Sequence, residues 1–374
     1  MKKLTAPILL VGTPSELADL RYASGFSAVD PVVYLHALRK RCLVVPTMEL
    51  GRARREAHHG VTVCTPASLG LTHKDQRRIS SWALGALRAA RIRHVMVSRF
   101  FPLGVAERLR RNGIHLEVAD VMLFPQREVK SAAEIRWIRE SQVAAVAAMQ
   151  SAVAMIRAAR VNRAGHLVHR GSVLTSESVR CAIEHVLVDH NCIARETIVS
   201  CGRDAAEPHA RGSGPLKAGV PIVIDIFPQH KEHGYWGDLT RTVVKGRADE
   251  QLKRMYRAVF AAQRVALDAL RAGVTGKTVD GKVRDVFEKR GFVTAVSGGV
   301  AEGFTHSTGH GVGLDIHEFP SLSPMGGRLR AGHVVTVEPG LYYRRFGGVR
   351  IEDTVVVTAR GWKPLAKCAC RLEV

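Results

Sequence analysis

Short apolar segments alternate with polar, helix-forming stretches over the first third of the chain. Five apolar segments stand out: Ala6–Gly12, Lys40–Thr47, Gly60–Pro66, Arg93–Arg99 and Ile114–Asp120. Each is short enough for a buried strand, and the stretches between them are long enough for helices. The pattern therefore predicts an α/β domain built from βαβ-like units.

The pattern changes near residue 127, where we place a domain boundary between residues 1–127 and 128–374. Pro125 interrupts the strand and helix alternation, and a long helical stretch follows it. Ser131 and Glu134 form the S-x-x-E sequence that caps a helix N-terminus. The second domain is thus expected to begin with a long helix.

The second domain contains a possible internal duplication. Its first half comprises helical stretches at 131–160 and 175–190, then strand-like runs at 220–227 and 235–244. Its second half comprises helical stretches at 249–272 and 278–290, then strand-like runs at 334–343 and 348–358. Repeated helix, helix, strand, strand units predict two similar halves, packed face to face around a shared central site.

Composition limits the class of protein. The chain has 374 residues, of which 46% are hydrophobic and 24% charged, enough for two globular domains with proper cores. The formal net charge of +21 would suit a nucleic-acid binder, but the basic residues are spread from Arg21 to Arg371 without a recognisable motif. The seven cysteines lack C-x-x-C spacing, which favours a cytoplasmic location. No segment approaches the roughly 20 apolar residues that a membrane-spanning helix requires.

Four carboxylates interrupt otherwise apolar strands: Asp225, Asp238, Glu338 and Glu352. Burying an unpaired carboxylate costs several kcal/mol. Taken singly, each could bond backbone amides or pair with Arg241 or Arg350. Taken together, their separations of 13 and 14 residues match the two predicted hairpins. Four acids that converge on one pocket would repel strongly, and two divalent cations would neutralise them.

A glycine-rich segment, GFTHSTGHGVGLDIHEF, spans residues 303–319 and holds three histidines. His306, His310 and His317 could be metal ligands, proton carriers or polar loop residues. The glycines among them, Gly309, Gly311 and Gly313, either let the backbone pass close to a crowded site or simply form a flexible loop.

The ordered set Asp225, Asp238, His310, Glu338 and Glu352, in the motifs IDIF, GDLTRT, STGHGVGLDIHE, TVEPG and RIED, resembles the pita-bread metallopeptidases. The resemblance is to the branch that contains Xaa-Pro aminopeptidase and Xaa-Pro dipeptidase, and it covers residues 128–374. The segments SELADLRYASGF and LVVPTMELGRA resemble the creatinase-type N-terminal domain of that branch. The implied fold is an α/β N-terminal domain followed by an α+β pita-bread domain with pseudo-twofold duplicated halves.

The resemblance also implies roles for individual residues. Asp225 would hold one metal ion, His310 and Glu338 the other, and Asp238 and Glu352 would bridge both. Mn²⁺ is the expected metal, with Co²⁺, Fe²⁺ or Zn²⁺ as alternatives. A water shared by the two ions would supply hydroxide for attack on the peptide carbonyl.

Further residues carried over by the resemblance surround this centre. Glu338 would also act as general base, and His317 would stabilise the carbonyl oxygen or the tetrahedral intermediate. His306 and His209 would line the substrate pocket, with His209 also helping to stabilise the transition state. Arg350 would orient a bridging carboxylate.

The expected activity is hydrolysis of an N-terminal Xaa-Pro bond in peptides with proline at the second position, by a homodimer. Ser321 occupies the position where many dipeptidases of the family have an arginine for the substrate carboxylate, which favours an aminopeptidase. Arg328 or Arg330 could replace that arginine, so a dipeptidase remains an alternative, as does an aminopeptidase without proline preference. An alternative of another class is a non-catalytic pita-bread protein that binds nucleic acid or protein.

The chain departs from the family pattern at one place. In the family, the two aspartates that correspond to Asp225 and Asp238 usually lie closer together, and PQHKEHGY, residues 228–235, forms a short insertion in the hairpin turn. We expect the turn to lengthen without moving either ligand, and the resemblance gives no prediction for the nearby substrate wall.

Overall fold

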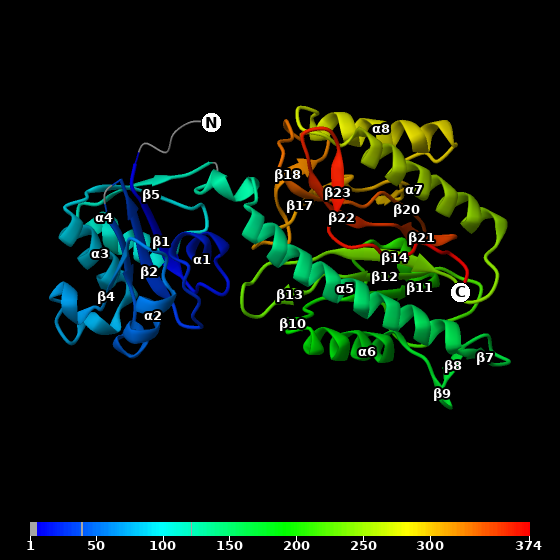
Figure 1. The fold of residues 1–374 in the computed structure, drawn as a ribbon, viewed down its shortest axis with the longest axis horizontal. Helices are drawn as coiled ribbons and strands as arrows, with labels where there is room; N and C mark the ends of the chain where they lie inside the picture. The colour runs from blue at the N-terminus through cyan, green and yellow to red at the C-terminus, as the bar shows by residue number, and fades with distance from the viewer. Residues whose placement is uncertain (1–5, 39, 121) are drawn as a thin grey trace. The chain divides into compact units, whose positions relative to one another are not determined.

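The computed structural model describes residues 6–38, 40–120 and 122–374 (Figure 1). Contacts between residues divide the chain into two compact units, one that ends at Arg127 and one that begins at Glu128. Within the described ranges, no helix is long and apolar enough to cross a membrane.

The N-terminal unit contains a six-stranded sheet with the strand order β4-β3-β2-β1-β5-β6. Its strands are β1 (Ile8–Gly12), β2 (Val32–Ala37), β3 (Lys40–Val44), β4 (Val61–Cys64), β5 (His94–Val97) and β6 (His115–Val118). The five predicted strands are confirmed, whereas the prediction omitted β2. Strand β2 pairs antiparallel with β1 and β3, so the sheet is mixed and not purely of the βαβ kind.

Helices cover both faces of this sheet: α1 (Ala18–Ser24), α2 (Leu50–Glu56), α3 (Ile79–Ala90) and α4 (Leu103–Arg111). Successive residues of a strand point to opposite faces. Accordingly, Leu9 and Val11 pack with α3 and α4, while Ile8 and Leu10 pack with α1 and α2. Burial on both faces explains why β1 is apolar throughout.

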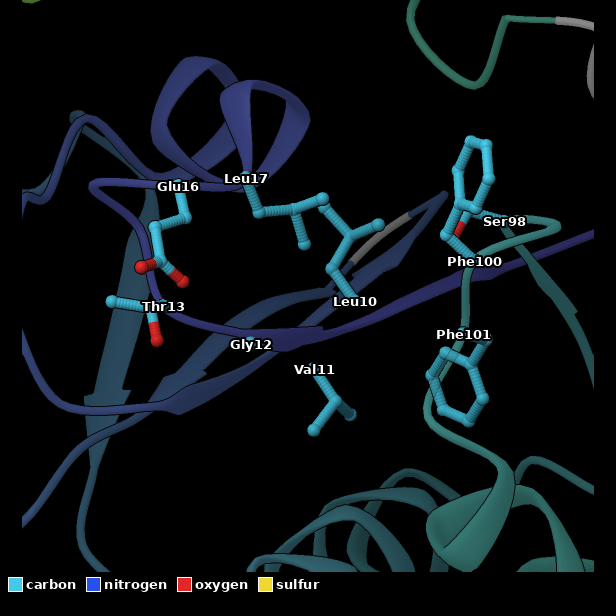
Figure 2. A pocket seen from close by; sticks show the side chains of 9 residues that line it. All are labelled: Leu10, Val11, Gly12, Thr13, Glu16, Leu17, Ser98, Phe100 and Phe101. Atoms are coloured by element: carbon cyan, nitrogen blue, oxygen red, sulfur yellow. The ribbon is translucent and has the colours of Figure 1, made fainter. Parts of the chain in front are cut away.

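A small hollow of about 200 Å³ lies beyond the ends of β1 and β5 (Figure 2). Glu16 is the one charged side chain among the described residues that line it, and Phe100 is 86% exposed beside it. A single carboxylate in so small a space provides no cluster of reactive groups.

The C-terminal unit has the predicted duplicated organisation (Figure 1). In its first half, α5 (Ala132–Ala158) and α6 (Ser176–Asp189) pack on the sheet of β11 (Ile198–Cys201), β12 (Ile222–Ile226) and β14 (Leu239–Val243). In its second half, α7 (Glu250–Ala269) and α8 (Gly276–Lys289) pack on the sheet of β18 (Glu318–Leu322), β17 (Gly309–Gly311), β19 (Val334–Val337), β22 (Asp353–Val357) and β23 (Trp362–Pro364).

Shorter strands complete the unit: β7 (Arg160–Val161), β8 (Leu167–His169), β9 (Ser172–Val173), β10 (Cys192–Ile193), β13 (Gln229–His230), β15 (Ala295–Ser297), β16 (Val300–Glu302), β20 (Gly340–Tyr343) and β21 (Gly347–Arg350). Strands β20 and β21 form the hairpin that connects β19 to β22. The predicted capping box is present, because Ser131 and Glu134 bond each other's backbone amides at the start of α5.

Hydrogen bonds join the two halves directly along β14. The hydroxyl of Thr242 donates to the carbonyl of Arg350 (2.9 Å) and accepts from its amide (3.0 Å). Two residues along, the Glu352 amide donates to the Thr240 carbonyl (3.1 Å). The central strands of the two halves therefore lie side by side, and residues on them share one site.

Arg241 strengthens this junction between the two halves. Its buried guanidinium donates to a carboxylate oxygen of Asp353 (2.7 Å) and to the carbonyls of Glu352, Cys368 and Ala369. Arg241 therefore pairs with Asp353 and with none of the four strand acids. This excludes an ion pair with Arg241 as the explanation for the burial of those acids. The contacts tie β14 to both β22 and the C-terminal segment.

We predict that Arg241→Met destabilises the C-terminal unit by about 3–5 kcal/mol, because it leaves buried carbonyls and Asp353 without their donor. Thermal unfolding followed by circular dichroism measures the loss. Arg257→Met is the control, since Arg257 lies on α7 with its side chain 62% exposed and a long 3.9 Å ion pair. Equal unfolding midpoints for the two variants would contradict this account of Arg241.

Candidate metal centre

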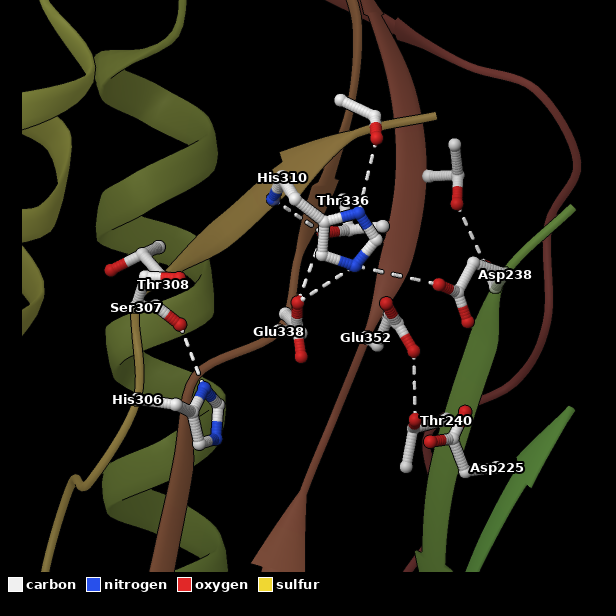
Figure 3. A network of polar contacts seen from close by, with 12 residues as sticks. Asp225, Asp238, Thr240, His306, Ser307, Thr308, His310, Thr336, Glu338 and Glu352 are labelled. Atoms are coloured by element: carbon white, nitrogen blue, oxygen red, sulfur yellow. Dashed lines mark hydrogen bonds and ion pairs between the residues drawn. The ribbon is translucent and has the colours of Figure 1, made fainter. Parts of the chain in front are cut away.

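A cavity of about 590 Å³ opens between the two halves of the C-terminal unit. All the site residues predicted from the sequence line it: His209, Asp225, Asp238, His306, His310, His317, Glu338, Arg350 and Glu352. Figure 3 shows the carboxylates and His310 pointing toward one another from strands of both halves. The folded chain therefore brings together residues that span more than a third of its length.

Each of the four carboxylates lies in a strand or at its end. Asp225 is in β12 and Asp238 directly precedes β14, while Glu338 directly follows β19 and Glu352 directly precedes β22. Three of them are buried, and Glu338 is partly buried. The equivalent positions in the two halves explain why the sequence separations are nearly equal.

His310 presents a nitrogen lone pair to this cluster. Its Nδ1 lies 3.1 Å from the Gly311 carbonyl, which can only accept, so Nδ1 carries the proton of the neutral ring. Its Nε2 then faces Asp238 Oδ2 at 3.6 Å and Glu338 Oε1 at 3.2 Å. A neutral imidazole offers these carboxylates another acceptor, an arrangement that requires a cation between them or protonation of the ring.

Asp225 has one oxygen held and one without a partner. Its Oδ2 accepts from Arg350 Nη2 at 2.6 Å, whereas its buried Oδ1 has no hydrogen-bond partner. Arg350 also donates to the hydroxyls of Tyr342 (2.8 Å) and Thr240 (3.2 Å). An unpartnered buried carboxylate oxygen is costly unless a cation occupies the space beside it.

The electrostatics of the cluster point the same way. Burial, followed by repulsion from the neighbouring carboxylates, raises the pKa of Asp238 and of Glu352 well above the ordinary values. For Glu338, burial opposes the charged form, but the His310 ring, when protonated, donates to this carboxylate and lowers its pKa to about 2. Four ionised carboxylates would carry more negative charge than Arg350 neutralises, so the raised pKa values mark sites that need a proton or a cation. The oxygen-rich donor set with one imidazole fits divalent metal ions.

Two threonines that the sequence analysis missed orient the acids. The Thr240 hydroxyl donates to Glu352 Oε2 at 2.7 Å, across the junction between the halves. The Thr336 hydroxyl donates to Glu338 Oε1 at 3.1 Å and accepts from the His310 amide at 3.0 Å. Each threonine lies two residues from an acid along its strand, a spacing that places both side chains on one face.

The glycines of the segment 303–319 allow close backbone approach, as the first of the two interpretations predicted. A Cβ on Gly309 would lie 2.1 Å from the Thr336 carbonyl oxygen, and one on Gly311 would lie 2.5 Å from that of Phe319. Gly309 and Gly311 pass this tightly between β18 and β19, and this contact fixes His310.

The remaining histidines differ in their contacts. Both ring nitrogens of His306 are engaged, Nδ1 with the Ser307 carbonyl (2.7 Å) and Nε2 with the Tyr342 hydroxyl (2.9 Å), so His306 forms a fixed wall. His317 packs its ring edge to face with His310, at 4.2 Å between centroids. His317 and His209 are exposed to the cavity and form no hydrogen bond with another described residue.

The insertion at 228–235 places His230 and His233 beside Glu140 of α5, and the three form a second group of potential ligands. The two imidazole rings stack at 3.8 Å with planes only 9° apart. Because an ion lies in the plane of a coordinating imidazole, parallel rings do not converge on one ion. No residue of the insertion lines the cavity.

We predict that Gly309→Ala costs about 1–3 kcal/mol and weakens divalent-metal uptake, because the new methyl group pushes β17 away from β19 and displaces His310. Thermal unfolding and equilibrium dialysis with Mn²⁺ measure both effects. Gly327→Ala is the control, since a Cβ there meets nothing within 4 Å. Unchanged metal uptake in Gly309→Ala would show that this close approach does not position the ligand.

Comparison with known proteins shows the family of the chain. Residues 136–359 match the model of metallopeptidase family M24. An Xaa-Pro dipeptidase from Pyrococcus horikoshii is 31% identical over 282 residues, 74% of each chain. The crystal structure of a prolidase from the same organism superposes with a TM-score of 0.80 and 27% identity, covering 98% of this chain and 95% of that one.

An X-Pro aminopeptidase from Thermotoga maritima has a similar fold, with a TM-score of 0.81 and 26% identity over 99% of this chain and 97% of that one. The relatives named Xaa-Pro dipeptidase nevertheless support the dipeptidase alternative better than the aminopeptidase preferred from Ser321. The fold is the pita-bread fold with a preceding N-terminal domain, as predicted. The chain belongs to metallopeptidase family M24 and is a metallo-exopeptidase.

Proposed function

We propose that the protein is an Xaa-Pro dipeptidase that uses two divalent metal ions. The observation that carries the proposal is the convergence of four carboxylates and the His310 Nε2 lone pair on one cavity, where Asp225 Oδ1 has no partner. Relatives named Xaa-Pro dipeptidase support the substrate class. The volume of about 590 Å³ falls in the usual range for small-ligand sites.

The residues would divide the two ions between them as follows. Asp225 would bind one ion, His310 and Glu338 the other, and Asp238 and Glu352 both. Mn²⁺ is the metal we propose first, because oxygen donors with one imidazole suit it better than they suit a structural zinc site. When bound, the ions supply Lewis-acid activation and a water of lowered pKa.

The protein's own groups would then position the substrate and move the proton. Oε1 of Glu338 is held by Thr336, and Oε2 forms no hydrogen bond with another described residue, so Oε2 would accept the proton of the attacking water. His317 and His209, both exposed in the cavity, would donate to the substrate carbonyl oxygen as negative charge develops on it. Arg350, fixed by Tyr342 and Thr240, would hold Asp225 in place.

Two further expectations remain predictions, namely the homodimer and the cytoplasmic location. Seven free cysteines are consistent with a reducing compartment.

Removal of metal tests the proposal most simply. EDTA should abolish hydrolysis of Ala-Pro, and Mn²⁺ or Co²⁺ should restore it, because no other group in the cavity can activate water to the same extent. The rate on Ala-Pro should exceed the rate on Ala-Pro-Ala and on Ala-Ala. Activity that resists the chelator would refute metal catalysis. A preference for the tripeptide would favour an aminopeptidase over a dipeptidase.

Substitutions of the neighbouring His310 and His317 should have different effects on metal binding and on rate. His310→Ala should lose bound metal, since it removes a ligand atom, and with it nearly all activity. His317→Ala should keep its metal and lose about 10²–10³-fold in kcat, the usual cost of one donor to a developing oxyanion. Elemental analysis and steady-state kinetics measure the difference. Equal metal loss in both variants would contradict the proposed division of roles.

A further inference from the structure

A dipeptidase needs a cation for the free carboxylate of its substrate, and the two arginines considered from the sequence do not supply it. Arg328 Nη1 donates to the Gly273 carbonyl at 2.9 Å. Arg330 Nη2 pairs with Glu128 at 2.5 Å, and its Nε contacts His333. Neither side chain lines the cavity, so neither replaces the arginine that Ser321 lacks.

Among the described residues, two guanidinium groups do line the cavity, those of Arg350 and Arg211. All three nitrogens of Arg350 are engaged, with Asp225, Tyr342 and Thr240 among its partners. Arg350 therefore has no donor to offer a substrate without releasing Asp225.

The backbone of Arg211 is held rigidly at the cavity wall. Its carbonyl accepts from the Val199 amide (3.0 Å) and from Arg180 Nη1 (2.7 Å), which donates to the Gly212 carbonyl as well (2.9 Å). Gly212 has a φ of 73°, and a Cβ there would lie 2.1 Å from the Val199 carbonyl oxygen. The loop is thus packed against β11, and this packing determines where the Arg211 side chain begins.

The side chain of Arg211 has nitrogen donors that can still bind a ligand. It is 48% exposed, and its Nε lies 3.3 Å from Oε2 of Glu196, which is 64% exposed and also lines the cavity. Its Nη1 and Nη2 form no hydrogen bond with the part of the chain that the structure describes. An exposed ion pair of this kind is weak, so an incoming carboxylate can displace Glu196 easily.

We propose that Arg211 is the receptor for the free carboxylate of the dipeptide and that Glu196 occupies it when no substrate is present. The proposal rests on the proposed function. A planar guanidinium binds a carboxylate through two parallel hydrogen bonds, which selects a substrate that ends one residue after the cleaved bond. The receptor lies on the loop that carries His209, in the opposite half of the unit from the position of Ser321.

The test compares Ala-Pro with its C-terminal amide, Ala-Pro-NH₂, as substrates of the Mn²⁺-loaded full chain. Arg211→Met should raise KM for Ala-Pro by roughly 10–100-fold with little change in kcat, and should leave KM for the amide unchanged. Arg328→Met is the matched control and should change neither. Glu196→Gln, which frees Arg211, should lower KM for Ala-Pro only, and it keeps the test decisive if Arg211→Met folds poorly.

The proposal is wrong if Arg211→Met alters both substrates equally, or if neither Arg211→Met nor Glu196→Gln changes the ratio of the two KM values. A different result would refute the proposed function, namely that the wild-type enzyme cleaves Ala-Ala as fast as Ala-Pro. In that event the same comparison is made with Ala-Ala and Ala-Ala-NH₂, so that the role of Arg211 is still decided.

Discussion

Mutual repulsion among four carboxylates, three buried and one partly buried, is the constraint around which the C-terminal unit is arranged. At about 4 Å and an effective dielectric constant near 20, one pair of like charges costs about 4 kcal/mol. Arg350 offsets part of this repulsion at Asp225, and threonine hydroxyls hold Glu352 and Glu338. Burial, followed by repulsion from the neighbouring carboxylates, raises the pKa of Asp238, and divalent cations would offset this cost as an apolar ligand could not.

The duplicated fold makes such a cluster possible. Neither half has enough acids to bind two ions, and the hydrogen bonds of Thr240 and Thr242 to the second half bring the two sets together. Arg241 fixes the same junction from the other side. Most of the apolar burial that stabilises the unit lies in two separate cores, one in each half. These two cores offset the cost of the polar junction between the halves.

The convergence of the four acids could be predicted from the sequence because acids inside apolar strands are physically anomalous and their spacing repeats, whereas His310 was added to the set by the family resemblance. The close approach at Gly309 was equally accessible, since glycine beside a predicted ligand suggests crowding. Tyr342 and Arg211 were not, because their partners are far away in the sequence and only the folded chain shows which donors remain free. If the protein is the dipeptidase that we propose, Ser321 misleads for the same reason, since a missing arginine in β18 says nothing about a cation on the opposite wall.

X-ray absorption spectroscopy at the manganese edge, combined with elemental analysis of the reconstituted protein, tests the central claim most directly. Our account predicts two ions per chain, about 3.5–4 Å apart, with oxygen-rich coordination and one imidazole. It also predicts that Asp225→Asn retains one ion and loses the other, because the buried Asp225 Oδ1 has no hydrogen-bond partner and is the atom we assign to that ion. A single ion in the wild-type chain, or full retention of both ions in Asp225→Asn, would contradict it.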